Sequence, residues 1–252
     1  MKKDCDVQPK LSVFLCCLYF LFNSCSEPIP ASKVNDISDI KAVIDIYQTL
    51  TDENDNSISV SLYDRKDKKF GSDSVNITVN GKKIEYKIVQ GLYYTKSYLY
   101  HTEKIAPENN QYEFQIQLAN GKKFFLGSVP SLKLSSSRNI IYNEEASLSQ
   151  DFSIHWSGLQ DVNVLYLSKT VKVNTKEKST VETFMEQPGD TIKIGPEGTY
   201  TLKKEKFSQP GETLDILGFE FTAEKTGAVN PRLLKGSNIK ITGNHDEQAN
   251  FK

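Results

Sequence analysis

The sequence has few of the residues from which metal sites and catalytic sites are usually built. Only three histidines and four cysteines occur in 252 residues. The histidines are far apart, and none belongs to a zinc motif such as HxH or HExxH. His245 precedes Asp246 and Glu247, but all three follow Gly243 in a polar stretch that we expect to be a solvated tail. The sequence therefore predicts no metal site.

Motifs of nucleophilic catalysis, phosphate binding and calcium binding are absent as well. There is no GxSxG elbow and no glycine-rich phosphate loop. Asp52, Asn54 and Asn56 have the first spacings of a calcium loop, but Ser57 and Tyr63 replace its glycine and its bidentate glutamate. We therefore expect no catalytic residue and no cofactor. A β-sandwich hydrolase stays open as an alternative, because its two carboxylates would be defined by their separation in space.

Neither sign of charge is in excess. The formal net charge is −1 at pH 7. The basic stretches at 65–69 and 203–206 are each interrupted by an acidic residue, which is typical of solvated loops. Because nucleic-acid binding requires a basic surface, no nucleic-acid partner is expected.

Cysteines and long apolar runs are confined to the N-terminus. The four cysteines are Cys5, Cys16, Cys17 and Cys25. Lysines precede an apolar run at 11–22, which is the order of an export signal. As a helix this run would rise about 18 Å, well short of the roughly 30 Å hydrocarbon layer of a bilayer. We therefore expect cleavage, with an ordinary secretory signal or an uncleaved signal anchor as the alternative.

The end of this run resembles the lipobox of bacterial lipoproteins. Ser24 supplies the small residue before Cys25, whereas Phe22 and Asn23 depart from the usual leucine and small residue. In that family the cysteine after the cleavage site is acylated and becomes the new N-terminus. The resemblance implies a signal peptide at 1–24 and lipidation of Cys25.

The residues after Cys25 extend this expectation. A polar segment at 25–35 contains two prolines and is expected to be a flexible tether. Ser26 follows Cys25 where an inner-membrane lipoprotein would have aspartate, which implies an outer-membrane location. The mature chain would keep one thiol, so it could form no internal disulfide, and acylation would remove that thiol.

The rest of the chain has the composition of an all-β protein. It is rich in tyrosine and phenylalanine, and Gly, Asn, Asp and Ser separate short apolar runs. No long amphipathic helix pattern occurs, which argues against cofactor-binding α/β folds. A strand is expected from about Ala42. Phe152, Ile154 and Trp156 alternate as in a strand, which predicts a buried tryptophan and an outward His155.

Two Asn-Gly pairs predict hairpin turns. Asn80 and Gly81 both tolerate positive φ, as a type I′ turn requires, and outward pairing places Ile77 opposite Ile84. A simple two-residue turn at 120–121 would place the polar Gln117 opposite the apolar Phe124. A bulge or a longer loop is expected there.

A proline and a serine run at 128–139 mark the expected domain boundary. We expect two tandem immunoglobulin-like antiparallel β-sandwich domains, at 36–130 and 138–245. The segment GPEGTYTL at 195–202 resembles the approach to the tyrosine corner of immunoglobulin-like sandwiches. That resemblance implies a corner role for Tyr200.

The most aromatic segment of the chain is GLYYTKSYLYHTE at 91–103. Tyr94, Tyr98 and Tyr100 share one side of a strand. If this side faced water, its rings could stack on sugars or peptides. The alternative is that these tyrosines are ordinary core and rim residues of a strand.

Together these features predict a non-catalytic, lipid-anchored protein of a bacterial envelope, acting as a binding or assembly module. The membrane, through the lipid, and another envelope protein or a glycan are its expected partners. A glycan-binding surface lipoprotein is one alternative. A pilus or adhesin-type sandwich subunit is another, and it would need an open edge strand.

Overall fold

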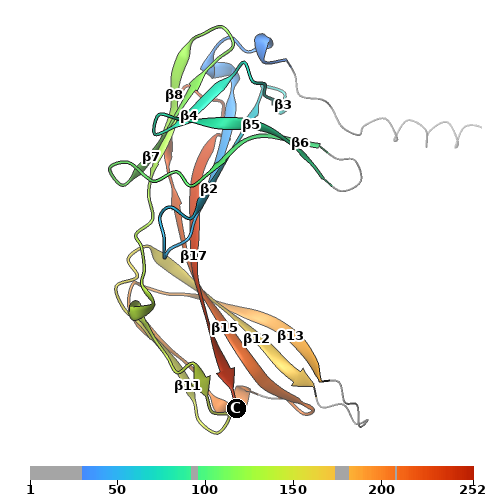
Figure 1. The fold of residues 1–252 in the computed structure, drawn as a ribbon, viewed down its shortest axis with the longest axis vertical. Coiled ribbons are helices and arrows are strands. Elements are labelled where there is room, and N and C mark those ends of the chain that lie inside the picture. Colours follow the sequence, from blue (N-terminus) through green and yellow to red (C-terminus); the bar gives the residue numbers. More distant parts are fainter. Residues whose placement is uncertain (1–29, 92–95, 174–181, 208) are drawn as a thin grey trace, which may run out of the picture.

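The structure is a computed structural model that describes residues 30–91, 96–173, 182–207 and 209–252. Cys25, the signal peptide and Tyr94 lie outside these residues. Within them the chain forms strands and four short 3-10 turns, and no α-helix, so the all-β prediction is confirmed (Figure 1). The turns are η2 (Ala31–Lys33), η3 (Ile37–Asp39), η5 (Ser137–Asn139) and η6 (Lys204–Lys206).

The strands fall into two groups along the chain. The first group is β1 (Lys41–Gln48), β2 (Asn56–Tyr63), β3 (Lys69–Phe70), β4 (Asn76–Val79), β5 (Lys82–Gln90), β6 (Lys96–Glu103), β7 (Gln111–Gln117) and β8 (Lys123–Pro130). The second group is β9 (Ile140–Ile141), β10 (Glu145–Ala146), β11 (Phe152–Trp156), β12 (Val162–Val173), β13 (Thr183–Lys193), β14 (Gly198–Leu202), β15 (Glu212–Thr226), β16 (Ala228–Val229) and β17 (Asn238–Phe251).

The N-terminal half forms two sheet layers that meet at β5. The beginning of β5 pairs with β4, and the remainder pairs with β6. One layer has the order β17-β1-β2-β6-β5 and the other β5-β4-β7-β8-β16. Alternate residues of each strand fill the space between the layers, as in β2, where Ile58, Val60 and Leu62 are buried.

Both turn predictions for this half are confirmed. Ile77 pairs with Ile84, and Asn80 and Gly81 have positive φ angles of 47° and 73°. At the second Asn-Gly the last pair is Gln117 with Lys123, which leaves a five-residue loop. The β7–β8 pairing also contains a register shift after Phe114. The longer loop restores the buried face of both strands.

The C-terminal half packs a sheet of order β13-β12-β15-β17 against a small sheet of order β14-β11-β9. Aromatic contacts join the two, since the Trp156 ring lies 5.7 Å from Phe221 and the Phe152 ring 5.4 Å from Phe251. The predicted burial of Trp156 and exposure of His155 are confirmed. The sandwich thus forms around an aromatic core.

The role implied for Tyr200 is not found. This residue lies in the middle of β14, where it pairs with Ile154 of β11, rather than at a crossover between the two sheets. Its ring is half-buried against the core. Among the described residues its hydroxyl makes no hydrogen bond to the upstream backbone, which a corner role requires.

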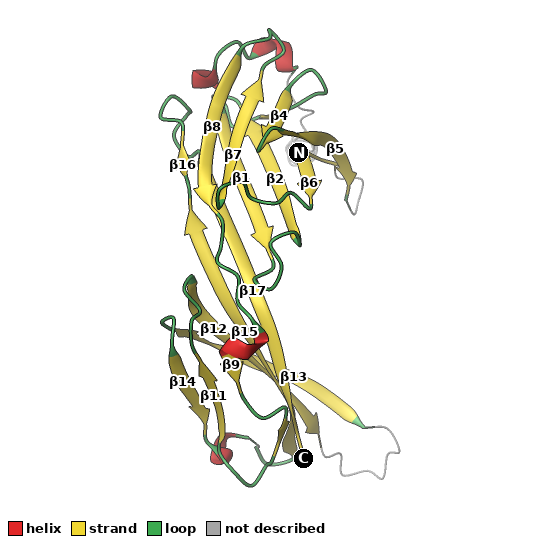
Figure 2. Cartoon of the chain, turned by 60° about the vertical axis from the view of Figure 1, so that its left-hand side comes forward, coloured by secondary structure: helices red, strands yellow, loops and turns green. Residues whose placement is uncertain are grey.

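Strand β17 extends through both halves of the molecule (Figure 2). Its first residues pair in parallel with β1, with Ile239 opposite Ile44 and Ile241 opposite Ile46. Further along, it pairs antiparallel with β15 as far as Asn250. The division of the chain into two domains stays a prediction, because one strand is hydrogen-bonded to both halves.

The expected solvated tail after Gly243 is wrong. These residues continue β17, and His245, Ala249 and Phe251 are buried. Buried and more exposed residues alternate along this strand, although most of them are polar. The alternation arises because β15 and β10 pair with the strand. Burial of alternate residues on one face of a sheet is enough to hold such a strand in place.

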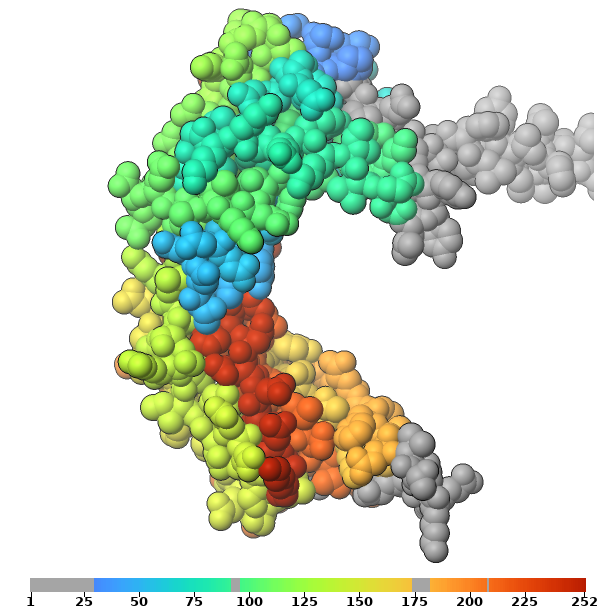
Figure 3. All heavy atoms as spheres, viewed as in Figure 1, coloured from blue at the N-terminus to red at the C-terminus, as the bar shows by residue number. Residues whose placement is uncertain are grey.

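The molecule is curved, with an open concave side. The β5–β6 hairpin and the β12–β13 hairpin both project toward that side, from the upper and the lower half respectively (Figures 1 and 3). These two hairpins are the parts of the fold that extend farthest from the packed layers.

Candidate functional sites

The structure separates the tyrosines that the sequence grouped as a stacking site. Tyr100 is 1% exposed, and its hydroxyl donates to the carbonyl of Ser72 at 3.0 Å and accepts from the amide of Ser72 at 3.1 Å. Burial raises the pKa of this hydroxyl well above its ordinary value. Tyr100 is thus a core residue and has no free ring face, because the segment after β3 lies over it. Tyr98 is partly exposed and pairs with Ile88.

The end of the β5–β6 hairpin carries exposed apolar side chains that sequence reasoning missed. Ile88 is 59% exposed and Val89 is 49% exposed. Adjacent strand residues point to opposite faces, so both faces of the hairpin are apolar here. The available signal was the pair of neighbouring β-branched residues, which breaks the alternation expected of a half-buried strand.

A buried polar network lies where the two halves meet. Ser135 Oγ is 2.7 Å from His245 Nδ1, and His245 Nε2 is 3.0 Å from Glu247 Oε1. Tyr142 donates its hydroxyl proton to the other Glu247 oxygen at 2.8 Å. Burial, together with this hydrogen bond to Glu247, raises the pKa of Tyr142.

The order serine, histidine, carboxylate is that of a nucleophilic triad, but this network has no access to a substrate. Ser135 is 9% exposed and His245 is 5% exposed. A nucleophile must contact the atom that it attacks, which a buried hydroxyl does not. The network therefore satisfies polar groups inside the junction and does not form a catalytic site.

Gln48 completes the polar interior of this junction. It is fully buried, donates to the carbonyl of Leu132 at 3.2 Å, and lies 3.4 Å from the hydroxyl of Tyr112. The backbone beside it is closely packed, because a Cβ atom at Gly243 would overlap the carbonyl oxygen of Gln48. Buried amides that are fully paired favour one arrangement of the elements around them.

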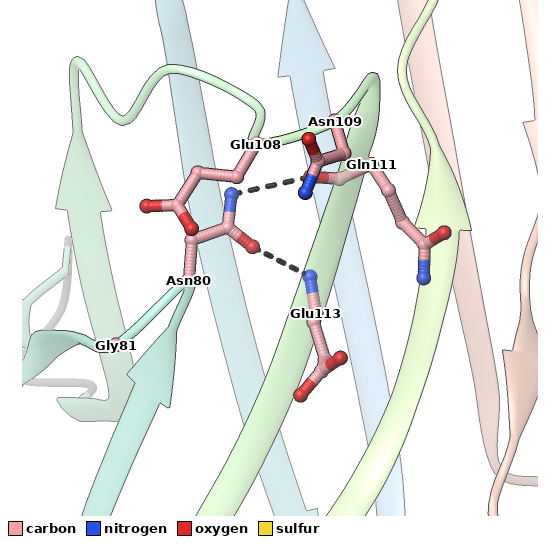
Figure 4. Close-up of a pocket in the computed structure, with 6 residues that line it drawn as sticks. All are labelled: Asn80, Gly81, Glu108, Asn109, Gln111 and Glu113. Carbon is pink, nitrogen blue, oxygen red and sulfur yellow. Dashed lines mark hydrogen bonds between the residues drawn. The ribbon is translucent and has the colours of Figure 1, made fainter.

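Two hollows lie on the solvent face of β4, β7 and β8. The larger has a volume of about 260 Å³ and is lined by Asn80, Gly81, Glu108, Asn109, Gln111 and Glu113 (Figure 4). Asn80 shapes its wall, accepting from the Glu113 amide at 2.8 Å and donating to the Gln111 carbonyl at 3.2 Å. The smaller hollow, of about 80 Å³, is lined by Asn76, Thr78, Gln115, Ile116, Gln117 and Lys123.

Within the ranges that the structure describes, no three side chains of His, Cys, Asp or Glu lie close enough to hold a metal ion. In the same ranges no helix has the length and hydropathy of a membrane span.

No protein family and no curated protein matches the sequence. Several solved structures align with most of the chain at low similarity. A cytokine receptor complex has 10% identity and a TM-score of 0.26, covering 80% of this chain and 98% of that one. The adhesin InvE of Yersinia pseudotuberculosis has 10% identity and a TM-score of 0.24, covering 86% of this chain and 60% of that one.

A third structure is SGBP-B from a mixed-linkage glucan utilization locus of Bacteroides ovatus, in complex with a mixed-linkage heptasaccharide. It has 14% identity and a TM-score of 0.21, covering 84% of this chain and 60% of that one. Two of these neighbours are thus bacterial adhesin or glycan-binding proteins. TM-scores this low carry no argument about the function of this chain.

Proposed function

We propose that this protein is a non-catalytic binding module, held to a bacterial outer membrane by acylation of Cys25. The observation that carries the proposal is the exposed apolar end of the β5–β6 hairpin. Ile88 and Val89 lie on a two-stranded ribbon that projects from the sheets, where the described residues leave about half of each side chain exposed.

Clustering makes these side chains significant. Scattered exposed apolar residues are normal, whereas grouped ones mark interaction sites. Tyr98 lies directly opposite Ile88 across the hairpin, so an aromatic ring adjoins Ile88 on one face, while Val89 lies on the other face. Full burial of one exposed aliphatic side chain contributes about 1.5–3 kcal/mol, and a partner binding here would gain the share of the area that is still exposed.

The polar interior supports a non-catalytic role. The serine, histidine and carboxylate that have a triad-like order are buried at the junction and hydrogen-bond to one another. The two hollows beside β4 and β7 are shallow and lined mainly by amides and two glutamates. These observations favour recognition over bond cleavage.

An adhesin-type subunit is a second candidate, favoured by the open edge of β13. Among the described strands β13 is last in its sheet and pairs with β12 alone. An exposed edge can accept a strand from another chain. Pro188 has no amide proton and interrupts this edge, so strand addition is expected at 183–187.

The anchor is tested by metabolic labelling with an alkyne analogue of palmitate. The full chain is expected to incorporate the label and to sediment with outer membranes. Cys25→Ser should lose both properties, whereas Cys17→Ser should keep both, because its cysteine lies inside the apolar run. Equal labelling of the Cys25→Ser and wild-type chains contradicts the anchor.

The binding surface is tested by photo-crosslinking in intact cells. A photoreactive amino acid at position 88 is expected to give a discrete adduct. Position 141 is the matched control, because Ile141 is 65% exposed and lies on β9, away from the hairpin. The same adducts from both positions, or none from position 88, contradict a partner at the hairpin.

A further inference from the structure

The solvent face of β4, β7 and β8 carries two rows of side chains that cross three strands. In one row Asn76 pairs with Gln117, which pairs with Lys123. In the next row Thr78 pairs with Gln115, which pairs with Phe125. Residues that are paired across strands point to the same face, so the six form one surface.

This surface is rich in side chains that both donate and accept hydrogen bonds. Asn76, Gln115 and Gln117 each offer an amide NH₂ group and a carbonyl oxygen, and Thr78 offers a hydroxyl. The solvent face of β5 differs, because it carries the charged residues Lys83, Glu85 and Lys87. Among the six residues of the two rows only Lys123 is charged.

Phe125 places an aromatic ring in the second row. Its side chain is 42% exposed, although phenylalanine is usually buried. The β8 backbone at this residue is fixed, since Asn230 donates to the Phe125 carbonyl at 2.8 Å. Gln115, directly opposite, is held by its amide group, which donates to Glu113 Oε1 at 3.0 Å. A flat apolar surface and an oriented amide thus lie side by side.

Asn76, which lines the hollow between these rows, has an unpaired polar atom. Asn76 Oδ1 is buried and accepts no hydrogen bond within the described part of the chain. A buried acceptor without a partner is costly, and such atoms are rare in folded proteins. Because Asn76 lines the hollow, a turn of its amide would bring this oxygen to a ligand hydroxyl.

We propose that this face binds a neutral polyhydroxylated ligand, a glycan chain, with Phe125 stacking on a sugar ring and Gln115 and Asn76 bonding its hydroxyls. A sugar hydroxyl is both donor and acceptor, as are these amides. The inference rests on the proposed function, because it names the ligand class of a binding module. The site is separate from the β5–β6 hairpin.

Charge and size agree with this ligand class. Lys123 is the one charged residue of the two rows, so the face presents no cluster of charge for an ionic ligand. The three strands span roughly 10 Å across, and the rows, extended by Asn80 and Glu113, span roughly 14 Å along the strands. The larger hollow continues the surface at that end (Figure 4). The site suits a short stretch of a chain more than a single small molecule.

The test is affinity electrophoresis of the purified full chain in detergent. The probes are three neutral polysaccharides, a soluble β-glucan, a xylan and a galactomannan, with anionic polygalacturonate for comparison. Retardation by at least one neutral probe, and less by polygalacturonate, is expected. Phe125→Ala and Gln115→Ala should each weaken the affinity for the retarding polysaccharide about tenfold. Tyr166→Ala is the control, since this exposed aromatic residue lies on β12.

The outcomes separate this inference from the proposed function. No retardation by any neutral probe overturns the glycan site and leaves the anchor and crosslinking results standing. The glycan site is also overturned if the Tyr98→Ala variant loses retardation while the Phe125→Ala variant is retarded as strongly as the wild type. The glycan would then bind at the β5–β6 hairpin. Near-ultraviolet circular dichroism of each variant checks that the fold is retained. We expect every variant to retain the fold, because the replaced side chains are at least partly exposed.

Discussion

Ser135 and His245 are 110 positions apart in the sequence and are joined by a hydrogen bond of 2.7 Å between Ser135 Oγ and His245 Nδ1. The bond connects the segment between the two halves with the strand that extends through both. The backbone reinforces it, because the Ser135 amide donates to Leu50 at 2.7 Å and the Leu50 amide to Asn244 at 2.9 Å. Loss of this contact would affect the whole fold.

Replacement of His245 by alanine is expected to lower the free energy of unfolding by about 2–3 kcal/mol. The change removes the imidazole that bonds both Ser135 Oγ and Glu247 Oε1 inside the junction. Urea unfolding followed by tryptophan fluorescence measures it. His155→Ala is the control, since His155 is exposed, and should change stability by less than about 0.5 kcal/mol. Equal effects of the two variants would show that the junction network adds nothing.

Gly243→Ala is expected to destabilise the protein by about 1–3 kcal/mol. The added methyl group would overlap the carbonyl oxygen of Gln48 and lie 2.7 Å from Leu132 Cδ1, in a junction where the backbone has little room to move. Gly195→Ala is the matched control, because its nearest contact would be 3.9 Å away. Thermal unfolding midpoints compare the two. A Gly243→Ala midpoint as high as that of Gly195→Ala contradicts the close approach.

The protein is expected to lose stability as the pH rises above about 10. Burial raises the pKa of Tyr112, so the folded chain keeps this proton while the unfolded chain loses it at the ordinary value near 10. The unfolded state then binds fewer protons, and the free energy of unfolding falls with rising pH, whereas below pH 10 the contribution is complete. Unfolding curves between pH 8 and 11 measure the slope.

Tyr112→Phe provides the comparison for this alkaline effect. It removes one titrating group, so its slope above pH 10 should be shallower by up to about 1.4 kcal/mol per pH unit. The lost contact with Gln48 should lower stability by a constant amount at all pH values. Parallel curves for the variant and the wild type would show that Tyr112 ionises equally in both states.

Residues 30–136 expressed alone are not expected to fold. Strand β1 would lose its neighbour β17, and the core would lose Ile239 and Ile241, which are fully buried. Removal of large buried side chains costs several kcal/mol each, more than a single sandwich of this size can spare. Near-ultraviolet circular dichroism of the fragment, with and without a peptide of residues 227–252, tests this. A folded fragment without the peptide would make the halves independent domains.

Much of the local structure follows from the sequence. The alternation of Phe152, Ile154 and Trp156 placed the tryptophan in the core, and Asn80-Gly81 set the register of its hairpin. Both depend on a few neighbouring residues. The candidate sites were less accessible to sequence reasoning. Tyr100 was grouped with Tyr98 because the two share a strand face, yet the segment at Ser72 covers one and not the other.

The sequence by itself determined the all-β class and the positions of its clearest turns, because side-chain alternation and backbone preference are properties of short segments. Only the tertiary structure decided that the polar C-terminus is a strand and that His245 is buried. It also decided that Asn76, Gln115 and Phe125 share one exposed face. The burial and the neighbours of a residue depend on which strand, distant in the sequence, pairs with its own. A polar residue can be buried when its partners satisfy its hydrogen bonds.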